Sequence, residues 1–331
     1  LDNISAVNGN HNGGDIEIGS DGNLYIGVGD AGRDPRGDSG SAGSNDAAQD
    51  LTLLNGKILR VTRDGFPAPG NPISGPGTAR CAFRGNTSAT PASHCQELFA
   101  WGLRNPYRIA FDRNDGSDRL VINDVGQRTF EEVNEGLIGR NYGWPEREGD
   151  CPQGDTPPCP AAPSQYTDPI TSYGRSFGTY ITAGAFVPNG LWPAEYDGAY
   201  LFGDAGSGAI YLRSASGAVD YATPFATGAF GIVDMTFGFD TDGRMVLYYV
   251  RSNGDVRVVT PPAQPAPPAA NDLKMVPITP VRAFDTLDDT GGPAGSWFNG
   301  TTRLIDLDAP AGTRSALVNL TYAATAGPGF L

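Results

Sequence analysis

The stretch Asp15-Ile-Glu-Ile-Gly-Ser-Asp-Gly-Asn-Leu-Tyr-Ile-Gly-Val-Gly-Asp30 holds two short runs rich in β-branched and aromatic residues around a Ser-Asp-Gly-Asn turn. Such runs favour strands, and a polar Gly-containing turn between them predicts a β-hairpin. A hairpin returns the chain to where it started, so residues equally far from the turn become neighbours across the strands. His11 and Asp30 are therefore predicted to lie close together at the open end of this hairpin.

Three further hairpins are predicted along the chain. They pair residues 108–111 with 120–123, 185–187 with 199–202, and 233–239 with 245–250. Other candidate strands lie at 57–61, 209–212 and 255–259. Units of three or four strands that repeat along a chain are typical of β-propeller blades, and their unequal lengths disfavour a strict short-period repeat.

The composition agrees with an all-β protein, because 46 Gly and 27 Pro accompany the strand-forming residues and apolar runs at helical spacing are scarce. Asp and Glu outnumber Lys and Arg by 37 to 23, and no block of basic residues occurs. Such a chain repels a phosphate backbone, so no nucleic-acid partner is expected; the acidity itself commonly serves only solubility. The sequence contains no apolar stretch long enough to predict a transmembrane segment.

The four cysteines form two close pairs, Cys81 with Cys95 and Cys151 with Cys159. Of the three possible pairings, this one closes the shortest loops, so we expect two local disulfides and a secreted protein in an oxidising extracellular or periplasmic compartment. The alternative is a zinc site. The 13 and 7 residues between the paired cysteines differ from the CxxC spacing typical of zinc ligands.

A Pro- and Ala-rich stretch, residues 261–271, marks a domain boundary, because it can extend but cannot bury a core. It separates a propeller over residues 1–260 from a small β module over residues 272–331. The abrupt starts and ends at Leu1 and Leu331 favour a fragment, so we expect the N-terminal blades of the propeller to be absent from this chain.

Polar side chains recur at the open ends of all four predicted hairpins. They are His11, Asp30, Arg104, Asn105, Asp204 and Arg251. Blades around a common axis would gather these ends at one mouth. An imidazole beside a carboxylate accepts protons well, and a guanidinium in a mouth suits an anion. The simpler alternatives are a loop histidine bonded to the backbone and an arginine that locks two blades together.

Glu131 and Glu132 follow a turn that contains Gly126. Adjacent carboxylates at such a place suit Ca²⁺, which takes about six to eight oxygen ligands and readily accepts backbone carbonyls. A solvated pair of charges is the other interpretation of the same pattern.

Seven motifs occur in order between residues 9 and 260: His11-Asn-Gly-Gly14, Ser20-Asp-Gly-Asn-Leu-Tyr25, Gly29-Asp30, Gly56-Lys-Ile-Leu-Arg60, Gly102-Leu-Arg-Asn-Pro106, Glu131-Glu-Val-Asn134 and Asn141-Tyr-Gly-Trp-Pro145. Together they resemble the glucose/sorbosone dehydrogenase family, whose characterised members are soluble sugar dehydrogenases. The resemblance implies a six-bladed-type β-propeller that uses pyrroloquinoline quinone (PQQ). It also implies a sugar substrate, hydride transfer to PQQ, and a separate electron acceptor.

The resemblance also assigns roles around the cofactor. His11 is similar to the general base that takes the proton of the sugar's anomeric hydroxyl, and Asp30 to the carboxylate that orients it. Arg104 and Asn105 resemble the pair that contacts the quinone oxygens. Phe177 falls where an aromatic residue covers the cofactor ring.

Two calcium sites are implied as well. Gly126 and Gln127 match the positions whose backbone carbonyls hold the calcium that polarises PQQ, although Gln127 differs from the family's common proline. Glu132 and Tyr142 stand where some members bind a second, structural calcium.

The chain departs from the family where basic residues neutralise the three carboxylates of PQQ. The corresponding positions, near Gly206 and over residues 230–233, are not basic. Arg251 on the neighbouring strand, or Arg175 before Phe177, could replace them.

Two other function classes stay open, because a fold alone does not fix an activity. One is a non-catalytic extracellular propeller that binds carbohydrate or protein, and the other is a calcium-stabilised structural or adhesive module. The missing basic residues favour these two, whereas the four polar residues retained at the mouth favour the enzyme. The C-terminal module resembles a β module of secreted proteins from high-GC Gram-positive bacteria, with attachment, carbohydrate binding and a simple spacer as its possible roles.

Overall fold

The computed structural model describes residues 10–32, 46–82, 93–114 and 119–261, together with Leu1, Ile4 and Gly116. Within these residues the chain forms β-strands and two short 3-10 turns, η1 (Asp46–Ala48) and η2 (Ala194–Tyr196), and no α-helix. The all-β prediction is confirmed. The predicted module at 272–331 and the linker after Pro261 lie outside the described residues.

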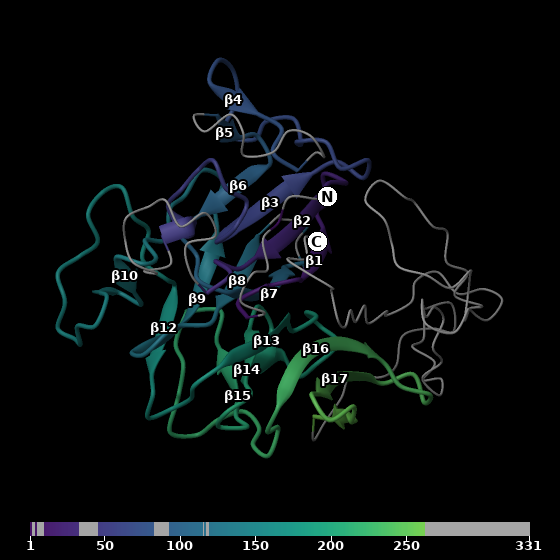
Figure 1. The fold of residues 1–331 in the computed structure, drawn as a ribbon. Coiled ribbons are helices and arrows are strands. Elements are labelled where there is room, and N and C mark those ends of the chain that lie inside the picture. Colours follow the sequence, from purple (N-terminus) through teal and green to yellow (C-terminus); the bar gives the residue numbers. More distant parts are fainter. Residues whose placement is uncertain are drawn as a thin grey trace.

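Four antiparallel sheets follow one another along the chain, and we number them blades 1 to 4 (Figure 1). Blade 1 contains β1 (Ile16–Ile18), β2 (Leu24–Val28), β3 (Lys57–Val61) and β6 (Leu98–Trp101). Blade 2 contains β7 (Pro106–Phe111), β8 (Leu120–Asp124), β9 (Phe130–Gly136) and β12 (Thr171–Gly174). Blade 3 contains β13 (Ile181–Phe186), β14 (Tyr200–Asp204) and β15 (Ile210–Arg213). Blade 4 contains β16 (Ile232–Phe239), β17 (Met245–Arg251) and β18 (Val256–Val259).

Two small strand pairs lie in the long loops. They are β4 (Thr78–Ala79) with β5 (His94–Cys95), and β10 (Arg147–Glu148) with β11 (Cys151–Pro152). Disulfides join Cys81 to Cys95 and Cys151 to Cys159 beside them, as predicted. The zinc alternative is therefore wrong, because all four thiols are consumed in these bonds.

The first strands of the blades pack against one another in order: β1 contacts β7, β7 contacts β13, and β13 contacts β16. First strands that meet in this way line the axis of a propeller. Apolar side chains fill the space between consecutive blades. Between blades 1 and 2, for example, Tyr25 packs edge-on against Phe99 and Phe111, with ring centroids 5.1 and 5.0 Å apart.

A buried residue at the end of the second strand fixes the segment that leads into the first strand. Asp124, at the end of β8, accepts backbone N–H bonds from Arg104 and Asn105 at 2.9 and 2.6 Å. Asp204, at the end of β14, accepts them from Thr179 and Tyr180, both at 2.8 Å. These bonds satisfy amides that no ladder reaches, so the carboxylates set the direction in which each blade begins.

In blade 4 the segment before the first strand is held by a hydrogen-bond donor instead of an acceptor. Ile232, the first residue of β16, pairs with Arg251 in the position that Asp204 occupies opposite Ile181. The Arg251 Nε donates to the Phe230 carbonyl at 2.7 Å. The strand-end position therefore orients the preceding segment in blade 4 by donating a hydrogen bond.

The sequence misplaced the start of one strand and did not predict β9. The strand predicted at 185–187 begins at Ile181, because the small residues Ala183 and Gly184 pack inside the blade although they carry little strand signal. Glu131 and Glu132 lie within β9, buried to 0% and 7% exposure. The interpretation of these two residues as a solvated charge pair is therefore wrong.

Replacing Asp204 with Asn tests the strand-end carboxylate. Asp204 also accepts from the Gly206 and Ser207 amides and from the Tyr173 hydroxyl, and the single oxygen of an amide cannot serve all these donors. We expect Asp204→Asn to lower the free energy of unfolding by about 3 kcal/mol, measured by urea denaturation. The exposed control Asp242→Asn should change it by less than about 0.5 kcal/mol; equal losses would contradict the assignment.

Candidate functional site

His11 lies between a carboxylate and a guanidinium, just before blade 1. Its Nδ1 is 2.8 Å from Asp30 Oδ1, and its Nε2 is 2.9 Å from Arg104 Nη2. A guanidinium can only donate, so Nε2 accepts from Arg104, and Nδ1 carries the proton that is donated to Asp30. The predicted contact between His11 and Asp30 is confirmed, and the geometry defines a neutral imidazole with one tautomer.

The backbone of His11 adopts φ = 50°, a left-handed conformation that residues with a side chain seldom take. The carbonyl of His11 accepts a hydrogen bond from the Ala31 amide at 3.2 Å, next to Asp30. The side chain of His11 is 15% exposed and that of Asp30 is fully buried. The ring thus lies at the edge of the interior, with its partner carboxylate behind it.

Asp30 is held by three donors. Besides His11, the Gly32 amide donates to Oδ1 at 2.7 Å, and the Trp144 indole Nε1 donates to Oδ2 at 2.8 Å. Hydrogen bonds to a carboxylate favour its charged form, so these donors offset the cost of burying the charge. The contribution of Trp144 was not predicted, because the indole comes from a loop more than a hundred residues along the chain.

Arg104 connects His11 to blade 2. Its Nη1 donates to the carbonyls of Val125 and Gly126 at 2.8 and 2.9 Å, while Nη2 reaches His11. The neighbouring Asn105 accepts from the Gly13 amide at 3.1 Å through its side-chain oxygen. Arg104 and Gly126 therefore lie together at the open end of the second hairpin.

Blade 3 joins the same end through Glu131. One oxygen of this buried carboxylate accepts from the Gly126 and Ile181 amides at 3.3 and 3.0 Å, and the other pairs with Arg175. Burial raises the pKa of Glu131 to about 8, although Ile181 and Arg175 oppose the shift. Arg175, whose side chain is 27% exposed, is thus already paired with Glu131, and its Nη2 lies 3.6 Å from Glu148.

Blade 4 joins through Ala205, which donates to the Tyr180 carbonyl and accepts from the Gly231 amide, both at 2.8 Å. The hydrogen bonds therefore run continuously from His11 to blade 4. The side chains of Tyr180 and Phe230 are 56% and 55% exposed at this end, and neither was predicted to line the mouth. Arg251 is the residue that blade 4 contributes to the polar side chains predicted at the mouth.

Phe177 contacts blade 3 rather than the His11 cluster. Its ring stacks on Tyr221 with centroids 5.0 Å apart, and its carbonyl accepts from the Tyr211 hydroxyl at 2.6 Å. The side chain is 39% exposed. Its role over a cofactor stays a prediction.

The loop after β8 turns its amides toward one buried carboxylate. Glu148 Oε1 accepts from four successive N–H groups, those of Gln127, Arg128, Thr129 and Phe130, at 2.7 to 3.2 Å. The C=O and N–H of a trans peptide point in opposite directions. The carbonyls of Gly126 and Gln127 therefore point away from Glu148, and that of Gly126 accepts from Arg104 Nη1 at 2.9 Å.

The structure does not bring Glu132 and Tyr142 together through their side chains. The Glu132 carboxylate accepts from the Gly149 amide at 2.5 Å and from Asn134 Nδ2 at 2.9 Å. The Tyr142 hydroxyl instead donates to the Glu135 carbonyl. The side chains around Glu132 nevertheless have spare acceptors: Asn134 Oδ1 and Glu148 Oε2 are buried with no hydrogen-bond partner among the described residues.

Carboxyl groups gather around Glu132. Burial, and then the charge of Asp124, raises the pKa of Glu132 to about 8. Burial likewise raises the pKa of Asp124 to about 7, against the opposing effect of its two backbone donors. Buried oxygens without donors and carboxylates that resist ionisation are what a bound cation would relieve. The residues present therefore fit a calcium ion.

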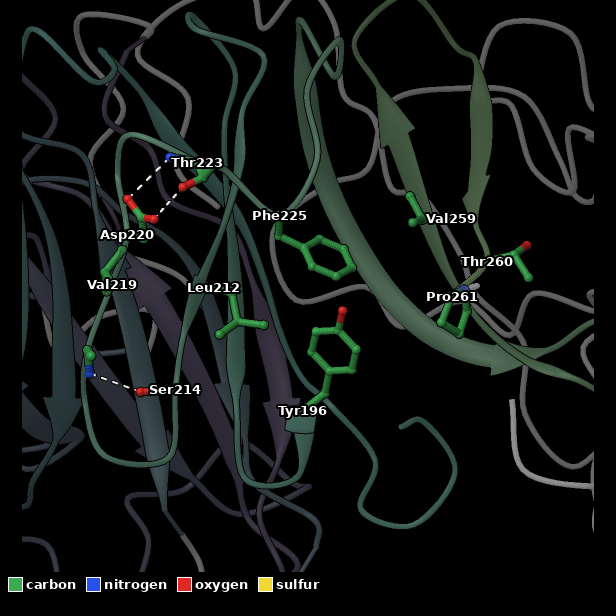
Figure 2. Close-up of a pocket in the computed structure, with 11 residues that line it drawn as sticks. Tyr196, Leu212, Ser214, Val219, Asp220, Thr223, Phe225, Val259, Thr260 and Pro261 are labelled. Carbon is green, nitrogen blue, oxygen red and sulfur yellow. Dashed lines mark hydrogen bonds between the residues drawn. The ribbon is translucent and has the colours of Figure 1, made fainter. Parts of the chain in front are cut away.

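A separate groove of about 670 Å³ lies between blades 3 and 4 (Figure 2). It is bordered by Leu212 near the end of β15 and Val259 at the end of β18, and thus opens at the end of the blades opposite the mouth. Asp220, the charged side chain in its lining, already accepts hydrogen bonds from Ala222 and Thr223. The groove therefore offers no free base comparable to His11.

A family model described as glucose/sorbosone dehydrogenase matches residues 2–218. The HIPL2 protein of Arabidopsis thaliana is 30% identical over 292 residues, which cover 75% of this chain and 39% of that protein. The aldose sugar dehydrogenase YliI of Escherichia coli K12 is 32% identical over 137 residues, 41% of this chain and 29% of that enzyme. The chain thus spans at most about two-fifths of the length of these curated relatives.

Among solved structures, the chain is similar to the PQQ-bound aldose sugar dehydrogenase of Streptomyces coelicolor, with 27% identity and a TM-score of 0.50. The match covers 75% of this chain and 60% of that enzyme. The soluble aldose sugar dehydrogenase of Escherichia coli, at 21% identity and a TM-score of 0.52, supports the fold alone. In the part of the chain that the structure describes, no helix is long and apolar enough to cross a membrane.

The raised pKa of Glu132 predicts how stability depends on pH. Between the ordinary value of 4.5 and about 8, the folded protein keeps a proton that the unfolded chain releases, so rising pH destabilises the fold through this residue. Glu132→Gln removes this effect. In the presence of a chelator, the variant should gain stability relative to the wild type as pH rises from about 5 to 8, by at most about 1.4 kcal/mol per pH unit.

Urea denaturation at several pH values measures this difference. Glu135→Gln is the control, because Glu135 is a partly exposed carboxylate three residues further along β9, paired with Arg119. A variant-to-wild-type difference that stays constant with pH would contradict the burial of a protonated Glu132.

Proposed function

The chain belongs to the glucose/sorbosone dehydrogenase family, and from this premise we propose that it is an oxidoreductase that oxidises an aldose or a related sugar with PQQ. The observation that carries the proposal is the His11 imidazole, held in one tautomer by Asp30 with its Nε2 lone pair on the side of Arg104. A neutral imidazole with a buried carboxylate behind it is a suitable general base.

In the proposed reaction, His11 Nε2 takes the proton of the anomeric hydroxyl while the hydrogen on the same carbon leaves as hydride. PQQ, when bound, supplies the acceptor for that hydride, and the sugar is released as the lactone. Arg104 Nη2 lies where the hydroxyl must approach Nε2, so substrate takes over this hydrogen bond. Arg104 keeps its Nη1 bonds to Val125 and Gly126 and remains in place to stabilise developing negative charge.

The residues at the mouth fit a planar, anionic cofactor. Tyr180 and Phe230 expose aromatic faces, and Arg104 Nε is buried without a hydrogen-bond partner among the described residues. Asn105 beside it would contact the same group. Arg251 of blade 4 donates to the Phe230 carbonyl and so places a cation beside it. These side chains would hold the cofactor against the Gly126 loop.

We propose Ca²⁺ as the second cofactor. The carbonyls of Gly126 and Gln127 would hold one ion at the mouth, where it would polarise the bound quinone. The Glu132 region would hold another, and the orphaned oxygens of Asn134 and Glu148 support this second position. Tyr142 would then contribute through its backbone rather than its hydroxyl, which is already bonded.

A secreted location, extracellular or periplasmic, is supported by the two disulfides, which persist in oxidising compartments. Electrons would pass from the reduced cofactor to a separate acceptor. A non-catalytic binding propeller is the alternative. This alternative is favoured because the two arginines that could neutralise the PQQ carboxylates already have acidic partners. Arg175 is paired with Glu131, and Arg251 lies 3.4 Å from Asp255.

Incubation of the protein with PQQ and Ca²⁺ separates these two functions. We expect saturable PQQ binding by calorimetry, and dye reduction with at least one aldose of a panel. His11→Gln should reduce kcat at least about 100-fold while leaving PQQ affinity within about threefold, because the base acts on the substrate. His94→Gln, at the exposed histidine of β5, is the matched control and should retain activity.

Absence of PQQ binding in the presence of Ca²⁺ would reject the enzyme and favour the binding propeller. Full activity of His11→Gln would leave the enzyme but reject His11 as its base.

A further inference from the structure

Trp144 contacts both of the groups that hold His11. Its indole Nε1 donates to Asp30 Oδ2 at 2.8 Å, and the Arg104 guanidinium lies 5.6 Å from the centroid of its ring. Trp144 is 3% exposed. One side chain therefore supports both partners of the imidazole, through a hydrogen bond to Asp30 on the Nδ1 side and a cation–π contact with Arg104 on the Nε2 side.

Asp30 depends on this donor because its two oxygens are supplied unequally. Oδ1 receives His11 and the Gly32 amide, whereas Oδ2 receives the indole. Asp30 is 0% exposed, so water cannot easily replace a lost partner. A carboxylate deprived of the indole would hold an unpaired charged oxygen in the interior, and rotation of the group to find another donor would break its bond to His11.

The backbone of Trp144 is fixed to blade 1, although the residue belongs to the loop after β9. Its amide donates to the Gly102 carbonyl at 2.9 Å, and its carbonyl accepts from Gln49 Nε2 at 2.6 Å. Gln49 and Asn141 also exchange two side-chain hydrogen bonds, at 3.0 and 2.7 Å. The indole is thus held rigidly on a backbone that spans blades 1 and 2.

We propose that Trp144 is a positioning residue for His11: by fixing the Asp30 carboxylate and supporting Arg104, it keeps the imidazole in the single orientation in which Nε2 can accept a proton. The consequence for catalysis rests on the proposed dehydrogenase function. The consequence for the ring itself does not, because the contacts are present in the protein without cofactor.

Trp144→Phe tests this proposal, because it removes the indole N–H and keeps an aromatic ring below Arg104. Carbethoxylation by diethyl pyrocarbonate reports on the ring without any cofactor, since the reagent modifies unprotonated imidazole nitrogens. The chain contains two histidines, so the exposed His94 serves as the internal reference. We expect the modification rate of His11 relative to His94, followed by mass spectrometry of peptides, to rise at least about threefold as the ring is released.

In protein loaded with PQQ and Ca²⁺, the same variant should lower kcat about tenfold with KM for the sugar within about twofold, because one hydrogen bond to a charged group is lost behind the base. Trp101→Phe, the same substitution at a half-buried tryptophan of β6, should change neither measurement. Gln49→Met removes the hydrogen bond to the Trp144 carbonyl and should change both measurements in the same direction by a smaller amount. This variant keeps the test available if Trp144→Phe does not fold.

An unchanged ratio of His11 to His94 modification in a folded Trp144→Phe protein would overturn the proposal. So would a rise in KM with kcat unchanged, since that would place Trp144 in sugar binding. Wild-type protein that shows no turnover with any sugar would reject the dehydrogenase function, while the modification ratio would still decide the role of Trp144.

Discussion

Buried carboxylates that accept backbone N–H groups organise the end of the blades at which the site lies. Asp124 and Asp204 each close a second strand and accept from the segment that leads into the first strand of the same blade. Unpaired amides in the interior would cost several kcal/mol in total. The carboxylates therefore fix where each blade begins, and these beginnings carry the side chains of the mouth.

Asp30 holds the equivalent place in blade 1 but receives side chains in addition to a backbone amide. Its donors include His11 and Trp144, so the carboxylate that has a structural task in blades 2 and 3 orients an imidazole here. In blade 4, Arg251 takes this place with the opposite charge. The same position in the four blades thus holds two structural carboxylates, the carboxylate that orients His11, and one arginine. Substitution at one repeated position therefore makes an asymmetric site from a repeated fold.

The sequence predicted what depends on local pairing. The hairpin around Asp21 placed His11 beside Asp30, and the close cysteine pairs predicted both disulfides. It failed where a role depends on burial or on distant segments. Glu131 and Glu148 receive amides from loops that no periodicity connects to them, and the indole of Trp144 crosses from blade 2 to blade 1. The exposed aromatics at the mouth also gave no signal, because exposure depends on the packing of the whole blade.

Asp30 and Arg104 together hold His11 as a neutral base whose Nε2 carries no proton and accepts from Arg104. Nitrogen-15 NMR of the imidazole rings measures this directly in the protein without cofactor, with His94 as an exposed reference. At alkaline pH we expect a protonated Nδ1 and an unprotonated Nε2 for His11, beside the averaged signals of a mobile ring for His94. A protonated Nε2, or averaged signals for His11 as well, would contradict it.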